Sequence, residues 1–206
     1  GHGIYEQGLR FSNIGTPMGS SVSLGIHESQ SRMWENQVGR SLSFWEWATP
    51  HLKTFFDEKT SAITPQHAYE SSNTVKPGFI RVDADEATYN MHVMIRFELE
   101  RVLINGELDP ADLPGEWNRL YKEYLGLDVP DNRRGCLQDV HWSMGAFGYF
   151  PTYTLGNLYC AQIFDAAQAA MPNLEADFRN GHFSHLKTWL NENIHQHGSR
   201  YSPSQL

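Results

Sequence analysis

Two short segments near the start of the chain carry side chains that can bind a metal ion. His2 lies in GHGIYEQGL, and Glu28 lies in GIHESQSR directly after a second histidine. Zinc accepts imidazole nitrogens and carboxylate oxygens, and catalytic zinc sites combine three protein ligands with an open position for water. We therefore expect His2 and Glu28 to be metal ligands. Two alternatives stay open: Glu28 could pair with Arg32 one helical turn away, and Gly1-His2 could be the remnant of an expression tag.

Two histidines that share one metal ion are naturally placed four residues apart on a helix, as in the pattern H-E-x-x-H. His2 would be the second histidine of such a pattern. The first histidine and the glutamate that acts as general base would then lie before Gly1. A third ligand, Glu28, would be brought from another helix.

Arg96 stands in the segment IRFELE, on the strongest helical pattern of the chain. An arginine held on a rigid helix presents two donors in a planar fork, which matches a carboxylate group. This geometry suits recognition of the free C-terminus of a peptide. The alternative is a structural arginine that pairs with Glu100 four residues later.

The segment GCLQDVHWSMGAFGYFPTYTLG crowds polar and aromatic side chains together. His141 and Tyr153 could both donate hydrogen bonds to an oxyanion that forms when water attacks a carbonyl, and Asp139 could orient His141. A buried histidine and tyrosine that bond to neighbouring backbone would explain the same pattern without catalysis.

Apolar residues at helical spacing predict helices over residues 20–38, 84–105, 116–125 and 157–170, with further helical pieces after residue 173. KPGFIRVD predicts a short strand, and GYFPTYTLG predicts an edge strand because Pro151 lacks a donor. Pro50 predicts a kinked or broken helix, and Thr64-Pro65 predicts a helix start. We expect one mainly α-helical domain over residues 1–206 with one or two short strands.

Composition restricts the class of protein further. The chain has 206 residues, 40% of them hydrophobic, a formal net charge of -8 and a pI of about 5.6. These values argue against nucleic acid as a partner, and the absence of a long apolar run argues against a membrane span. Cys136 and Cys160 are expected to be free thiols in the cytoplasm. Nucleotide-binding glycine motifs and C-x-x-C pairs do not occur.

The order of GHGIYEQGL, GIHESQSR, IRFELE, GCLQDVHW and GYFPTY resembles the carboxypeptidase Taq family of H-E-x-x-H zinc metallocarboxypeptidases. The likeness runs from residue 1 to about residue 170. It implies a mostly helical fold with a cleft, a homodimer, and one zinc ion or another divalent ion such as Co²⁺. It also implies release of single C-terminal amino acids from peptides that have a free C-terminus.

The resemblance assigns roles to five residues. His2 is similar to the second zinc histidine of the family, and Glu28 to the zinc carboxylate. Arg96 is similar to the residue that binds the terminal carboxylate of the substrate. His141 resembles the histidine of the active site, and Tyr153 resembles a tyrosine that assists the oxyanion.

The first zinc histidine and the catalytic glutamate of the family have no counterpart in this sequence. The resemblance therefore implies the C-terminal part of a larger catalytic domain, which begins inside the H-E-x-x-H motif and is inactive alone. Two other functions fit the same residues. One is a helical zinc endopeptidase or dipeptidase of the thimet type, and the other is a non-catalytic helical interaction module.

Overall fold

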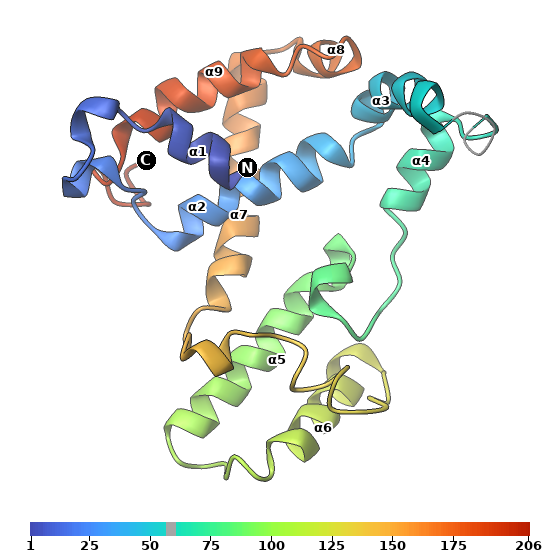
Figure 1. The fold of residues 1–206 in the computed structure, drawn as a ribbon, viewed down its shortest axis with the longest axis vertical. Coiled ribbons are helices and arrows are strands. Elements are labelled where there is room, and N and C mark those ends of the chain that lie inside the picture. The colour runs from blue at the N-terminus through green and yellow to red at the C-terminus, as the bar shows by residue number, and fades with distance from the viewer. Residues whose placement is uncertain (57–60) are drawn as a thin grey trace. The chain divides into compact units, whose positions relative to one another are not determined.

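The computed structural model describes residues 1–56 and 61–206, and this part of the chain is helical with no strand (Figure 1). The α-helices are α1 His2–Gly8, α2 Leu24–Arg32, α3 Leu42–Phe56, α4 Pro65–Ser72, α5 Glu86–Ile104, α6 Leu113–Leu125, α7 Pro151–Ala170, α8 Leu174–Arg179 and α9 Ser184–Asn193. Short 3₁₀ turns cover Phe11–Asn13, Pro17–Gly19, Arg81–Asp83, Trp142–Met144 and His195–His197. A π-helical segment, Met33–Gly39, follows α2 directly.

The chain forms two compact units. Unit 1 comprises residues 1–73 and 155–206, and unit 2 comprises residues 74–154. The four helical segments predicted from apolar spacing are confirmed, since α2, α5, α6 and α7 each lie within or across one of them.

The expectation of short strands is wrong for the described residues. The segment KPGFIRVD is irregular until the 3₁₀ turn Arg81–Asp83, and GYFPTYTLG becomes the start of α7. Pro151 is the first residue of that helix. A proline is favoured at a first helical position because its missing N–H has no partner there in any case.

Two other local predictions have different outcomes. Pro50 lies inside α3, which continues through it and is not broken. Thr64 caps α4 as predicted: its Oγ1 accepts a hydrogen bond from the His67 backbone N–H at 3.1 Å, and Pro65 is at the first turn.

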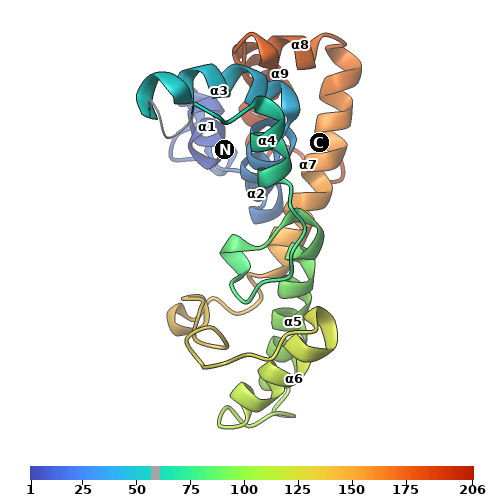
Figure 2. The ribbon, with the colours of Figure 1, turned by 90° about the vertical axis from the view of Figure 1, so that its right-hand side faces the viewer.

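Unit 1 has a core built from α1, α2, α7, α8 and α9. Tyr5, Met33, Leu186 and Leu190 have no exposed surface. α3 packs against α8 in this unit, and both are drawn near the top of Figure 2. Each fully buried large side chain contributes about 1.5–3 kcal/mol through removal of apolar surface from water.

Unit 2 has a core built on the pair α5 and α6, which pack against each other (Figure 1). Ile95 and Leu99 of α5 and Tyr121 of α6 have no exposed surface, and Trp117 is 1% exposed. α6 ends at Gly126, whose φ of 72° is the left-handed conformation that favours glycine after a helix.

Among the helices of the described residues, none has the length and apolar content that a membrane-spanning helix needs. Cys136 and Cys160 are both buried free thiols, as the sequence predicts.

Among the residues that the structure describes, two histidines are fully buried, one in each unit. His92 lies 3.0 Å from the Tyr121 hydroxyl through its Nδ1 atom. His195 lies 2.7 Å from both Asn191 Oδ1 and Gln30 Oε1. Burial lowers the pKa of each imidazole to about 4, with a further contribution from Arg96 to His92.

These low pKa values should make the stability of the fold depend on pH. Each imidazole stays neutral in the folded chain down to about pH 4, whereas in the unfolded chain it takes up a proton near its ordinary pKa of 6.5. The contribution is therefore complete above about pH 6.5 and is lost as pH falls toward about 4, by at most roughly 3 kcal/mol per histidine.

Thermal denaturation between about pH 7 and pH 4 measures this effect. We expect the fall in midpoint to be smaller in His92→Gln and in His195→Gln than in the parent chain. His67→Gln is the matched control, because His67 is exposed. An equal fall in all four proteins would contradict the assignment.

Candidate active-site residues

The predicted metal ligands lie together in unit 1, where α1 packs against α2. His2 Nε2 is 3.3 Å from Glu28 Oε2. The Glu28 side chain is 10% exposed and the His2 side chain is 51% exposed, so the pair lies at the edge of the core with one open side. α2 begins at this place because the Ser23 side chain accepts a hydrogen bond from the Ile26 backbone N–H at 3.1 Å.

A neutral imidazole and a carboxylate are the forms of His2 and Glu28 that would bind a metal cation. Burial lowers the pKa of His2 from its usual 6.5, although the Glu28 carboxylate acts in the opposite direction, so the imidazole is neutral at neutral pH. The other ring nitrogen, Nδ1, lies 2.7 Å from His27 Nδ1. With the ring proton on Nδ1, the lone pair of Nε2 faces the Glu28 carboxylate, and a cation between the two atoms would stabilise this arrangement. The donor set therefore fits a divalent metal ion.

Two ligands are fewer than a catalytic metal site uses. In the part of the chain that the structure describes, no group of three or more His, Cys, Asp or Glu side chains is arranged to hold a metal ion.

A glycine of α7 makes room for Glu28. A Cβ atom on Gly156 would lie 2.7 Å from Glu28 Cγ and 2.8 Å from its Cβ. The alternative partner of Glu28, Arg32, instead directs its Nε to Asn157 Oδ1 at 2.7 Å and its Nη1 to Glu35 Oε2 at 2.8 Å. The neighbours of Glu28 thus leave its carboxylate directed toward His2.

Unit 2 is organised around the carboxylate of Asp139. Arg81 Nη2 lies 2.7 Å from Asp139 Oδ1, and Arg96 Nη2 lies 2.6 Å from Asp139 Oδ2. Burial acts to raise the pKa of Asp139, but the two guanidinium groups outweigh it and lower the pKa below its usual 3.8. The three side chains carry a net charge of about +1 at neutral pH.

Arg96 has no exposed surface. Its Nη1 donates to the His92 carbonyl at 2.8 Å, and its guanidinium stacks on Trp117 at 4.6 Å. Its predicted structural partner, Glu100, accepts instead from the Trp142 ring N–H at 2.8 Å and from a backbone N–H. The guanidinium N–H groups of Arg96 and the flat face of its guanidinium are therefore already in contact with other groups of this chain.

His141 and Tyr153 lie together, as the sequence predicts. His141 Nε2 is 3.0 Å from the Tyr153 hydroxyl. The expected orienting role of Asp139 is wrong, because Asp139 pairs with two arginines, and the buried Nδ1 of His141 has no hydrogen-bond partner among the described residues. Burial lowers the pKa of His141, and Arg81 adds to that effect.

The five predicted residues fall into two groups. His2 and Glu28 belong to unit 1, whereas Arg96, His141 and Tyr153 belong to unit 2.

Sequence reasoning missed three residues at these places. Arg81 lies 4.7 Å from the centre of the Tyr153 ring and shares Asp139 with Arg96, yet it stands in a run that reads as a strand. His27 is adjacent to Glu28, and this position next to a predicted metal ligand is the one feature of the sequence that could have indicated a role for it. Gly156 is a single glycine inside a helical pattern, which is itself a sign of close packing.

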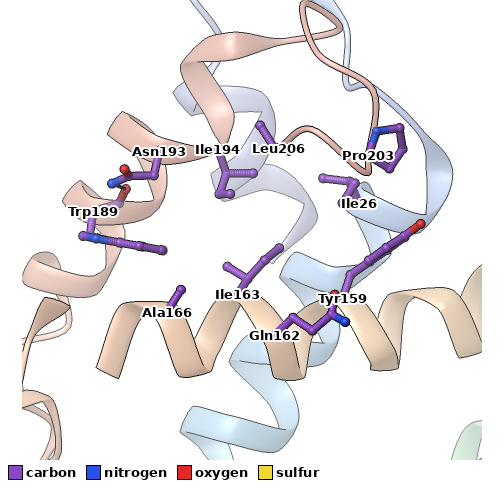
Figure 3. A pocket seen from close by; sticks show the side chains of 10 residues that line it. All are labelled: Ile26, Tyr159, Gln162, Ile163, Ala166, Trp189, Asn193, Ile194, Pro203 and Leu206. Atoms are coloured by element: carbon purple, nitrogen blue, oxygen red, sulfur yellow. Dashed lines mark hydrogen bonds between the residues drawn. The ribbon is translucent and has the colours of Figure 1, made fainter. Parts of the chain in front are cut away.

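A pocket of about 300 Å³ lies elsewhere in unit 1, between α2, α7 and α9 (Figure 3). Side chains of α7 and α9, among them Ile163 and Trp189, face one another across it. Its lining contains no histidine or carboxylate, so this pocket is not where the predicted metal ligands act.

Comparison with known proteins identifies relatives over the whole chain. Residues 1–206 match the family model described as carboxypeptidase Taq (M32) metallopeptidase. Thermostable carboxypeptidase 1 of Thermus thermophilus is 50% identical over 206 residues, which is 100% of this chain and 40% of the relative. Carboxypeptidase 1 of Bacillus subtilis is 41% identical over 209 residues, which is 100% of this chain and 41% of the relative.

Solved structures give the same result. The M32 carboxypeptidase from Deinococcus radiodurans R1 superposes with a TM-score of 0.92 at 48% identity, over 98% of this chain and 41% of that one. Trypanosoma cruzi metallocarboxypeptidase 1 superposes with a TM-score of 0.90 at 40% identity, over 98% and 42% of the two chains. This chain thus spans about two fifths of the length of the relatives that it matches.

The contact of Gly156 with Glu28 can be tested by adding one methyl group. An alanine normally stabilises a helix interior by about 1 kcal/mol relative to glycine. In Gly156→Ala the new Cβ would meet Glu28, so we expect a lower midpoint of thermal unfolding instead of a higher one. Gly115→Ala in α6 is the matched control, because nothing lies within 4 Å of a Cβ there. A stabilised Gly156→Ala chain would contradict the close approach.

The cluster around Asp139 makes a second prediction. Asp139→Asn leaves two buried guanidinium groups without a carboxylate, so we expect the free energy of unfolding to fall by about 3 kcal/mol. Asp131→Asn removes an exposed pair with Arg134 and should leave unfolding by denaturant unchanged. Equal effects of the two substitutions would show that the Asp139 cluster is not a buried ion pair.

Proposed function

Because this chain belongs to the carboxypeptidase Taq (M32) family of metallopeptidases, we propose that it is part of a metal-dependent carboxypeptidase that releases single C-terminal amino acids from peptides. The observation that carries the proposal is the pair His2 Nε2 and Glu28 Oε2, two metal-ligand atoms 3.3 Å apart in a chain whose full length matches the family. The partial coverage of each relative supports a longer protein that supplies further residues.

His2 and Glu28 are the residues of this chain that would hold the ion, which we propose to be Zn²⁺ or a similar ion such as Co²⁺. A bound divalent ion of this kind supplies Lewis acidity to the scissile carbonyl and lowers the pKa of a bound water. Gly156 sets the position of the Glu28 carboxylate by letting α7 approach it closely.

Tyr153 is the residue that we propose to donate a hydrogen bond to the carbonyl oxygen as negative charge develops on it. A hydroxyl that donates to the substrate can still accept, so we propose that His141 is the donor in their contact at 3.0 Å, with its proton on Nε2. His141 then fixes the direction in which the Tyr153 proton points. The unpartnered Nδ1 of His141 is compatible with this tautomer.

Recognition of the terminal carboxylate needs positive charge. The direct contact that the sequence predicts for Arg96 stays a prediction, and in this conformation its guanidinium is buried and already bonded. We propose that Arg96 acts by holding Asp139, and that the net positive charge of Arg81, Asp139 and Arg96 attracts the carboxylate. The homodimer and the cytoplasmic location stay predictions.

The chain by itself should be inactive. No H-E-x-x-H pattern occurs in its 206 residues, so a general base and a metal histidine of the family are lacking. We expect no chelator-sensitive hydrolysis when the purified chain is incubated with an N-blocked dipeptide and Zn²⁺. Turnover that a chelator abolishes, and that Glu28→Ala lacks, would overturn this expectation.

A longer protein that contains this chain should shorten peptides one residue at a time from the C-terminus. Amidation of the substrate C-terminus should block the reaction, whereas an endopeptidase would tolerate it. In that protein we expect Tyr153→Phe to lower kcat about 100-fold, since it removes one donor to the oxyanion. Tyr124→Phe is the matched control, because that hydroxyl bonds to Glu98 away from the predicted residues.

A further inference from the structure

We propose that His27 is a positioning residue, which acts with Glu6 to hold His2 in the tautomer whose Nε2 is free to bind the metal ion. This inference rests on the proposed function, in which His2 is a metal ligand. It concerns how the chain fixes the ring of that ligand and the place of its proton.

Four side chains form a continuous row. Glu6 Oε1 lies 2.9 Å from His27 Nε2, His27 Nδ1 lies 2.7 Å from His2 Nδ1, and His2 Nε2 lies 3.3 Å from Glu28 Oε2. α1 supplies His2 and Glu6, which are one helical turn apart, and α2 supplies His27 and Glu28. Each helix thus contributes one histidine and one carboxylate.

Two neutral rings carry two protons for the three contacts of this row, so one contact has no proton. The contacts at 2.9 Å and 2.7 Å are hydrogen bonds, whereas the His2–Glu28 contact is the longest, at 3.3 Å, and we take it as the one without a proton. The ionised Glu6 carboxylate only accepts hydrogen bonds, so His27 must carry its proton on Nε2. A neutral imidazole has one N–H, and His27 Nδ1 is therefore an acceptor. At 2.7 Å from it, His2 Nδ1 must be the donor. His2 Nε2 then has a free lone pair, which faces Glu28.

Packing holds the rings in this row. The planes of the His2 and His27 rings are nearly parallel, with centres 4.6 Å apart and an angle of 15° between them, and the rings approach each other through their Nδ1 edges. The ring of Tyr5, a core residue with no exposed surface, packs near His27, with the two ring centres 5.4 Å apart. Metal-binding histidines commonly donate their second N–H to a neighbouring acceptor, which raises their basicity and fixes their orientation. Here a second imidazole, polarised by Glu6, provides that acceptor.

The first experiment reads the tautomers directly in the metal-free chain. Long-range ¹H–¹⁵N spectra at about pH 8, above the usual pKa of histidine, distinguish a protonated ring nitrogen from an unprotonated one. We expect His2 to be protonated on Nδ1 and His27 on Nε2. A His2 ring that is protonated mainly on Nε2 would overturn the proposal.

Variants separate the hydrogen bonds from the packing. His27→Phe keeps a ring beside His2 but removes the acceptor, and we expect the Nδ1–H to Nε2–H ratio of His2 to fall about five- to tenfold, as the loss of one hydrogen bond implies. Glu6→Ala, at an exposed position, should lower the ratio in the same direction, and Glu6→Gln should restore it because the amide oxygen also accepts. An unchanged ratio in both His27→Phe and Glu6→Ala would contradict the proposal.

His185→Phe is the matched control. It removes a histidine that bonds to a carboxylate elsewhere in unit 1, Asp177, at 2.8 Å. We expect the His2 tautomer to stay unchanged in this variant.

Addition of Zn²⁺ separates this inference from the proposed function. We expect the ion to shift the Nε2 signal of His2 in the parent chain, and to shift it less in His27→Phe. If Zn²⁺ leaves His2 unaffected both in this chain and in a longer protein that contains it, although the tautomers are as proposed, the metal-ligand role of His2 fails and the proposed function with it. The wrong tautomer in a chain that does bind Zn²⁺ through His2 would overturn the positioning role alone.

Discussion

Burial of the Asp139 carboxylate between two guanidinium groups is the constraint on which unit 2 depends. Removal of a charged group from water costs several kcal/mol, and only close opposite charge with good hydrogen bonds offsets that cost. Arg81, Arg96 and Asp139 come from a 3₁₀ turn, a helix and a loop that lie far apart in the sequence. The irregular segments that carry Arg81 and Asp139 lack regular backbone hydrogen bonds, and the pairing of Asp139 with both arginines ties them to the hairpin of α5 and α6.

Unit 1 also buries polar side chains, both neutral and charged, and these too need hydrogen-bond or ion-pair partners. α2 buries an unusual set of polar side chains for a helix: Glu28, Ser29, Gln30 and Arg32. Gln30 is satisfied by His195, and Ser29 donates to a backbone carbonyl at 2.6 Å. Glu28 is the member of this set that is directed toward the open side, at His2. Because the buried polar side chains of α2 need hydrogen-bond partners, each of them is held in one position by the partner that it contacts.

The regular part of this fold could be predicted from sequence because it depends on residues close together in the chain. Helical spacing identified α5, and a threonine before a proline identified the start of α4. Pro151 shows the limit of such rules. Its fixed φ fits both an edge strand and a first helical turn, and the choice depends on the helix that follows it. The pairing of Asp139 was missed for a related reason, since its nearest polar neighbour in sequence, His141, is not its partner in space.

The π-helical segment Met33–Gly39 has a consequence for comparing proteins of this family. A π turn closes its hydrogen bond across one residue more than an α turn, so the segment contains surplus length relative to an α-helix that covers the same rise. Deletion of one residue there can convert it to α-helix, while Glu28 stays in place on the preceding turns of α2. In an alignment, a one-residue gap between Met33 and Gly39 would therefore mark a change from π-helix to α-helix, whereas a gap between His27 and Arg32 would rotate Glu28 by about 100° relative to the residues on the other side of the gap.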